Sequence, residues 1–158
     1  MSTNATRNPH WIAVLLAQRW LPLVVRAALV SAYVTGGVAK LANFHGAVLE
    51  QRHFGLHPGW LWAALAIVVE LGGSACVIAN RFVWLGTGGL GALTAVAMLV
   101  ANDFWNLTGE AHVFALNGFF EHLGLIAALV MATCVAGIKN SSGRAGVQQN
   151  SKDFQYHA

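Results

Sequence analysis

Charged residues are scarce in this chain of 158 residues, where Asp, Glu, Lys and Arg together make up 9%. Soluble domains carry about 25% charged residues, so the chain lacks the polar side chains that would cover a soluble globule. Its formal net charge of +3 is small, and its basic residues are scattered rather than gathered in one patch. We therefore expect no nucleic-acid partner.

Cysteine is also rare, and the two cysteines, Cys76 and Cys134, lie in separate apolar stretches. They form neither a CxxC pair nor a CxxCH haem-attachment site, so the sequence offers no support for dithiol redox chemistry. Histidine is present seven times. We predict no metal site, because no two histidines are expected to share a helix face at the HxxxH spacing of a metal-binding pair.

Long apolar runs take up most of the chain instead. Four of them reach the roughly 20 residues that a membrane-crossing helix needs, at about residues 21–42, 60–79, 82–104 and 113–137. The sequence therefore predicts an all-α integral membrane protein, a compact antiparallel bundle of four transmembrane helices. In the third run, Gly88, Gly91, Ala92 and Ala95 form a small-residue face on which a neighbouring helix is expected to pack closely.

The predicted membrane domain covers residues 21–138, with one segment on either side of it. Residues 1–20 form an N-terminal segment, in which the apolar residues 11–20 are either an interfacial segment or an inward extension of the first helix. Residues 139–158 are polar, and we expect them to form a disordered cytoplasmic tail.

Basic residues predict which way the bundle faces. Six of them fall on the side that holds both termini: Arg7, Arg19, Arg81, Lys139, Arg144 and Lys152. The opposite loops hold only Arg52, so the positive-inside rule places both termini in the cytoplasm. Arg26, one to two turns inside the first helix, can snorkel to the same surface. The six tryptophans lie near helix ends on both sides, as an aromatic belt requires.

Two charged residues inside the predicted spans need an explanation, because charge within a bilayer is unfavourable. Lys40 lies near the outer end of the first span, and Glu70 lies near the middle of the second. We expect a direct Lys40–Glu70 bridge only if the first helix runs on to about His45. The pair is a candidate catalytic site, in which Glu70 carries a proton and Lys40 binds a ligand oxygen. The alternative is that the pair only pins two helices together.

Other polar or aromatic residues fall in the outer half of the predicted bundle and are candidate cofactor-binding residues: Tyr33, Asn102, Asp103, Trp105, Asn117, Glu121 and His122. Asn117 and Glu121 stack at i, i+4 on the fourth span. For His122 we favour a structural role, with its ring bonded to a neighbour. Any site formed by these residues is expected to open to the outer side.

Four segments resemble the DoxX family of four-helix inner-membrane proteins. They are RAALVSAYVTGGVAKLANFHG at residues 26–46, AALAIVVELGGSACVIANRFVWLG at 63–86, NDFWN at 102–106 and NGFFEHLGLIAALV at 117–130. The resemblance covers about residues 24–137 and marks Lys40, Glu70, Asp103 and Trp105 as motif positions. Two positions differ, since Asn102 stands where the family often has histidine and Glu121 where it usually has lysine.

The resemblance implies a multi-pass protein of the bacterial inner membrane. Some family members are linked to membrane oxidoreductases that act with quinone. The first functional hypothesis is therefore a quinone-linked oxidoreductase subunit, with a quinone as the cofactor or substrate and a separate electron-transfer partner protein. The second is a non-enzymatic accessory or anchoring subunit of a membrane or periplasmic complex. A small-molecule carrier is a third hypothesis, and it would require a homo-oligomer.

Overall fold

Helices make up nearly all of the part of the chain that the computed structural model describes, residues 9–156, with side chains described for residues 9–138. Within these residues, four helices are long and apolar enough to cross a membrane. They are α2 (Leu21–Ala42), α4 (Gly59–Ile78), α5 (Val83–Ala101, extended by the 3-10 helix η1, Phe104–Asn106) and α6 (Gly109–Tyr156). The predicted all-α bundle of four transmembrane helices is thereby confirmed.

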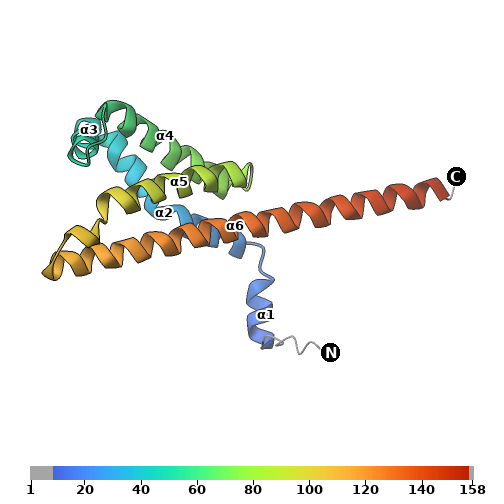
Figure 1. The fold of residues 1–158 in the computed structure, drawn as a ribbon. Coiled ribbons are helices and arrows are strands. Elements are labelled where there is room, and N and C mark those ends of the chain that lie inside the picture. Colours follow the sequence, from blue (N-terminus) through green and yellow to red (C-terminus); the bar gives the residue numbers. More distant parts are fainter. Residues whose placement is uncertain (1–8, 157–158) are drawn as a thin grey trace.

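The four long helices pack in the order α2, α4, α5, α6, each mainly against its neighbours in the chain (Figure 1). Helix α2 touches α6 only over a short stretch. Buried side chains from all four helices meet in the centre, and these are Val30, Tyr33, Val77, Leu90 and Leu129. We call the end that holds η1 the outer end and the end that holds the α4–α5 turn the inner end, after the predicted topology.

Helices α4 and α5 approach each other closely at Gly73 and Gly86. A Cβ atom added to Gly86 would lie 2.7 Å from the backbone oxygen of Gly73, so neither position leaves room for a larger residue. By contrast, a Cβ at Gly88 or Gly91 would meet no atom within 4 Å. The close helix contact therefore lies one face away from the predicted one. Small residues permit such an approach in lipid, but their spacing alone does not say which of them are used.

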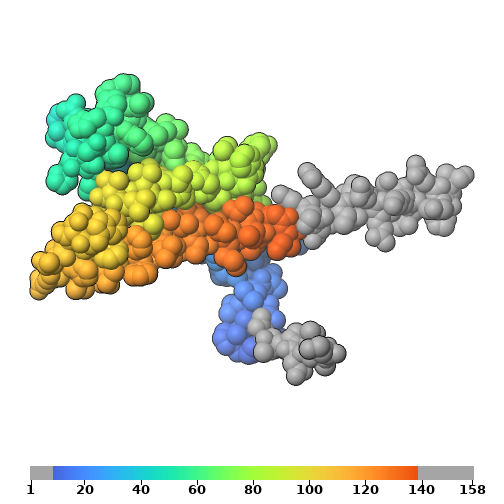
Figure 2. All heavy atoms as spheres, viewed as in Figure 1, coloured from blue at the N-terminus to red at the C-terminus, as the bar shows by residue number. Residues whose placement is uncertain are grey.

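The N-terminal segment forms a separate short helix, α1 (His10–Leu16), which buries none of its residues. It ends before α2 begins at Leu21 and projects from the bundle (Figure 2). An inward extension of the first transmembrane helix is therefore wrong for these residues. Residues 1–8 of the predicted N-terminal segment lie outside the described residues.

Helix α6 continues past its expected end near Gly137 and reaches Tyr156. Residues 139–156, predicted to be disordered, are thus helical in the structure, and residues 157–158 lie outside the described part. The polar composition of this stretch suggested disorder, but it contains no proline that would stop a helix already formed in the membrane.

A short helix that the sequence analysis did not anticipate, α3 (Phe44–His53), lies between α2 and α4 at the outer end. Asn43 caps it, since its side-chain oxygen accepts a hydrogen bond of 3.0 Å from the Gly46 amide. Gly55 ends it with a positive φ of 75°. The Leu56 amide then donates to the Gln51 carbonyl oxygen at 2.9 Å, as in a Schellman motif. Helix α3 therefore has defined ends and forms a wall at the outer end.

Candidate functional site

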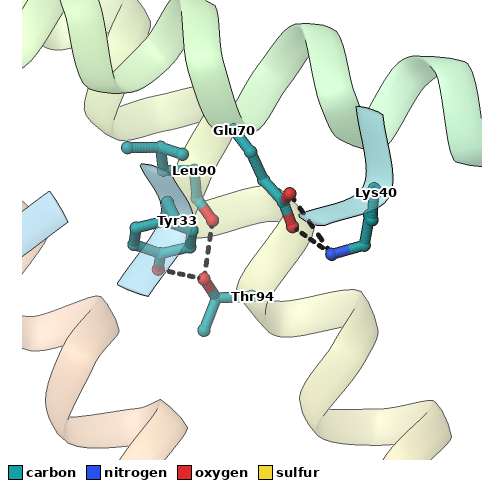
Figure 3. Close-up of polar contacts among 5 residues, drawn as sticks. All are labelled: Tyr33, Lys40, Glu70, Leu90 and Thr94. Atoms are coloured by element: carbon teal, nitrogen blue, oxygen red, sulfur yellow. Dashed lines mark hydrogen bonds and ion pairs between the residues drawn. The ribbon is translucent and has the colours of Figure 1, made fainter. Parts of the chain in front are cut away.

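Lys40 and Glu70 form an ion pair between α2 and α4. The Lys40 Nζ donates to both carboxylate oxygens of Glu70, at 2.9 Å and 3.2 Å (Figure 3). Their side chains are only 19% and 10% exposed. In antiparallel helices the pair converges naturally, because each side chain leans toward the N-terminus of its own helix. Lys40 thus leans inward and Glu70 leans outward.

The pair forms although α2 ends at Ala42, so the expectation that it needs a first helix reaching His45 is wrong. That expectation assumed that the outer ends of α2 and α4 lie at one level. In the structure the start of α4 packs on α3, where a Cβ on Gly59 would lie 2.7 Å from the Val48 carbonyl oxygen. Helix α4 therefore extends beyond α2, which brings Glu70 to the level of Lys40.

Two glycines of α2 bring its backbone up to the pair. A Cβ at Gly36 would lie 3.4 Å from the Lys40 Nζ and 3.5 Å from the nearer Glu70 oxygen. A Cβ at Gly37 would lie 2.8 Å from the Leu71 side chain, closer than packed atoms come. The Gly36–Gly37 step therefore allows α2 and α4 to approach at the depth of Glu70.

The ion pair lies in the wall of a cavity of about 270 Å³ at the outer end. All four membrane helices and α3 contribute to its lining. Glu50 and Gln51 come from α3, and Phe54 and Leu56 come from the α3–α4 connection. Trp62 and Ala66 come from α4, Leu93, Val96, Ala97, Val100 and Ala101 from α5, and His122 from α6. The cavity is thus largely apolar, with a small number of polar groups, as in many small-molecule sites.

His122 is half-buried in the wall of this cavity. Its Nδ1 lies 2.6 Å from the Gly118 carbonyl oxygen, one turn earlier on α6. A carbonyl oxygen can only accept, so Nδ1 carries the hydrogen. The bond holds the imidazole ring against the backbone of α6. It leaves Nε2 without a hydrogen-bond partner among residues 9–138.

Tyr33 lies deeper in the bundle than Lys40 and is not part of the cavity lining. Its hydroxyl forms a short hydrogen bond with the Thr94 hydroxyl, and the Thr94 hydroxyl donates to the Leu90 carbonyl oxygen at 2.7 Å (Figure 3). Tyr33 thereby ties α2 to α5 on the inner side of the ion pair. Among residues 9–138, its side-chain hydrogen bond is the one to Thr94, which gives it a structural role.

The remaining candidates lie at the outer end, but outside the cavity lining. The Asn102 side chain packs against the backbone of Gly118, and the Asp103 carboxylate accepts a hydrogen bond of 3.2 Å from the side-chain Nδ2 of Asn106. Trp105, Asn117 and Glu121 are exposed. The structure therefore brings together Lys40, Glu70 and His122 from the predicted set, and leaves the other residues apart from them.

The sequence analysis missed the cavity residues that α3 and its connection contribute. Glu50, Gln51 and Phe54 lie in a stretch too short and too polar to be a membrane span, so hydropathy predicts a loop there. The signals that mark this helix are the Asn43 cap and the basic Arg52 and His53 in its last turn. In the described part of the chain, no group of three or more His, Cys, Asp or Glu side chains is placed to hold a metal ion.

These features define a multi-pass helical membrane protein with a largely apolar cavity, which has an ion pair in its wall, at one end of the bundle. A comparison with protein families matches residues 21–103 to the DoxX family, which is more than half of the chain. The chain belongs to the DoxX family. The match includes the Lys40 and Glu70 segments and ends before α6 begins. Comparisons with curated proteins and with solved structures found no match.

Proposed function

We propose that this DoxX-family protein is the quinone-binding subunit of a membrane oxidoreductase. The observation that carries the proposal is the outer cavity of about 270 Å³, which has the Lys40–Glu70 pair in its wall. Sites for small molecules span roughly 300–1,000 Å³, so this cavity suits the head group of a ligand rather than a large substrate.

The cavity residues fit a quinone ring in their chemistry. Leu93, Val96 and the aromatic rings of Phe54 and Trp62 supply apolar and stacking surfaces. The Lys40 ammonium has three N–H donors, of which two bind Glu70, and the third suits a carbonyl oxygen. The arrangement thus provides an apolar enclosure with a polar wall, which fixes the orientation of such a ring.

A quinone exchanges two electrons and two protons with its quinol form, and here the electrons would come from a separate electron-transfer partner protein. The protein's own contribution is to bind the ring and to exchange protons. The Glu70 carboxylate and the His122 Nε2 are two proton-exchanging groups in the wall of one cavity. Lys40 orients the Glu70 carboxylate by binding both of its oxygens.

The proposal includes the membrane and the orientation. We place the protein in the bacterial cytoplasmic membrane, with both termini in the cytoplasm and the cavity opening to the outer side. Support comes from the positive-inside rule, because Arg19 and Arg81 lie at the inner end and Arg52 alone among the arginines of residues 9–138 lies at the outer end.

Tryptophan fluorescence tests ring binding directly, because a bound quinone quenches a nearby indole. Trp62 lines the cavity, whereas Trp60, two residues earlier on α4, is 56% exposed on the outside of the bundle. Titration of the purified protein with a short-chain quinone should give saturable quenching. Trp62→Phe should remove most of that saturable signal, and the matched Trp60→Phe variant should keep it. Equal signals from the two variants would refute binding in this cavity.

Proton exchange by Glu70 is tested by Glu70→Gln, which preserves the shape of the side chain but not its titration. In membranes that contain the native complex, this variant should accumulate normally and lose quinone reduction. Glu121→Gln is the matched control, because Glu121 is an exposed carboxylate outside the cavity. Full activity of Glu70→Gln would rule out its catalytic role.

An anchoring subunit is the second candidate, and one observation favours it. Of the four membrane spans, Gly109–Ile138 of α6 buries the smallest share of its residues, so this helix offers the most surface to another protein. On this hypothesis the Lys40–Glu70 pair holds the bundle together, and a partner protein packs on α6. Two results together would favour this candidate. Glu70→Gln would fail to accumulate in the membrane, and a protein that co-purifies with the wild type would be absent from variants with altered surface residues on α6.

A further inference from the structure

A second cavity lies at the inner end of the bundle, far from the proposed quinone site. It has a volume of about 450 Å³ and lies where α2 and α6 fail to pack against each other. Apolar side chains form most of its walls, among them Leu29 of α2 and Met131 and Val135 of α6. The α4–α5 turn closes one side with Asn80. We call this cavity the inner groove.

Arg26 brings an uncompensated positive charge to the inner groove. Its Nε donates to the Pro22 carbonyl oxygen at 2.9 Å, which fixes the guanidinium against α2. Its Nη1 is buried and has no hydrogen-bond partner in the side-chain-described part of the chain, residues 9–138. An unpaired donor of this kind is unfavourable, and more so when it carries charge. The groove is therefore lined by a cationic side chain that carries a donor which residues 9–138 do not satisfy.

No acidic residue between residues 9 and 138 lies near Arg26. Glu70 is paired with Lys40 at mid-bundle, and Glu50, Asp103, Glu110 and Glu121 all lie toward the outer end. An anion that neutralises Arg26 is therefore not supplied by residues 9–138. Charge complementarity thus points to an anionic ligand.

The position of Arg26 indicates what kind of anion this is. Arg26 is five residues from the start of α2, or about 8 Å along the helix, which places it near the boundary between head groups and acyl chains. Trp20 and Trp84, both exposed at the same end, are typical of that interface. A small soluble anion would leave the apolar walls uncovered, whereas a phospholipid supplies a phosphate and an acyl chain together.

We propose that the inner groove binds one anionic phospholipid, with its phosphate on the Arg26 guanidinium and an acyl chain along Leu29, Met131 and Val135. Arginine binds phosphate oxygens through its planar fork of donors. The Asn80 amide, at the rim of the groove, provides a further donor. The bound lipid fills the gap between α2 and α6 and thereby closes the bundle at its inner end.

Native mass spectrometry of the full-length protein in detergent tests the proposal, with phosphatidylglycerol and phosphatidylcholine of matched acyl chains as probes. The wild-type protein should retain one phosphatidylglycerol in preference to phosphatidylcholine. Arg26→Gln should weaken phosphatidylglycerol retention about tenfold or more, because hydrogen bonds between charged groups are worth about 1.5–3 kcal/mol. Arg81→Gln is the matched control, since Arg81 is an exposed cation at the same end outside the groove, and it should change retention less than twofold.

Two further arms separate a lipid from other occupants. Ala132→Phe fills the groove without changing its charge, and it should also reduce phosphatidylglycerol retention. Excess inorganic phosphate should not displace the lipid. Arg26→Lys keeps the positive charge but not the planar guanidinium, so its loss of phosphatidylglycerol retention should lie between those of the wild type and Arg26→Gln. This variant tests the role of Arg26 even if Arg26→Gln fails to fold.

Several outcomes would overturn the proposal. Equal retention by Arg26→Gln and Arg81→Gln would show that the lipid binds by general charge attraction. Equal retention of the two lipids would show that only the acyl chain is recognised. Displacement by inorganic phosphate would show a simple anion site.

Discussion

Removing Lys40 should destabilise the protein strongly, because it leaves Glu70 buried without its partner. The Glu70 side chain is 10% exposed and lies eleven residues, or about 16 Å, from the start of α4, so its contact with water is limited to the outer cavity. Breaking a buried ion pair by deleting one partner costs about 3–5 kcal/mol. We therefore expect Lys40→Met to lower the free energy of unfolding by about 3–4 kcal/mol, toward the lower part of that range, since both side chains keep some exposure.

The opposite deletion should cost less. In Glu70→Gln the orphaned ammonium of Lys40, two residues from the outer end of α2, can move toward the interface along its flexible stem. We expect a loss of about 1–2 kcal/mol for this variant. Replacing both residues by methionine should restore most of the stability, because an apolar pair of similar volume is often as stable as a buried ion pair.

Reversible unfolding of the purified protein by SDS in mixed micelles, followed by circular dichroism, measures all three variants. Glu121→Gln, an exposed carboxylate, is the control and should change stability by about 0.5 kcal/mol at most. Changes below that level in both single variants would refute the reasoning, because the pair would then not be formed in the membrane. A double variant that folds well and still lacks quinone reduction would separate the catalytic role of the pair from its structural role.

Three other predictions follow from the packing and the topology. Gly37→Ala should lower the free energy of unfolding by about 1–3 kcal/mol, because its methyl group would be forced against Leu71. Gly72→Ala should be neutral in the same SDS unfolding assay, because a Cβ there meets no atom within 4 Å. Tyr33→Phe and Thr94→Val should each cost about 1 kcal/mol and the double variant less than their sum, because they share one interhelical hydrogen bond. Fluorescent-protein and alkaline-phosphatase fusions to the C-terminus should show fluorescence and no phosphatase activity, and the reverse pattern would overturn the proposed orientation.

The membrane spans could be predicted from the sequence because apolar length alone determines them. The first span, predicted at residues 21–42, agrees with α2, and the second begins and ends within one residue of α4. Hydropathy could not reveal α3, since its ten residues are too few and too polar to cross a bilayer. It therefore could not reveal the cavity wall that α3 forms.

The Lys40–Glu70 pair shows why the site was harder to predict than the fold. Both residues were identified from the unfavourable free energy of charge in a bilayer. Whether they meet depends on the relative heights of α2 and α4, and this depends on how α4 packs on α3. The same limit applies to His122 and Glu121, which are adjacent in the chain. His122 lines the cavity and Glu121 is exposed, a difference of one helix position that the sequence pattern does not resolve.

A quinone-binding subunit holds a quinone in its outer cavity. The decisive measurement is extraction of small molecules from the purified protein, identified by mass spectrometry and accompanied by a visible and ultraviolet spectrum. We predict one quinone per protein chain in the wild type and in Trp60→Phe, with a reduced amount in a variant that fills the cavity, such as Ala66→Phe. A protein that carries only phospholipid and a co-purifying partner, with no quinone, would contradict the quinone-binding function and favour an anchoring subunit.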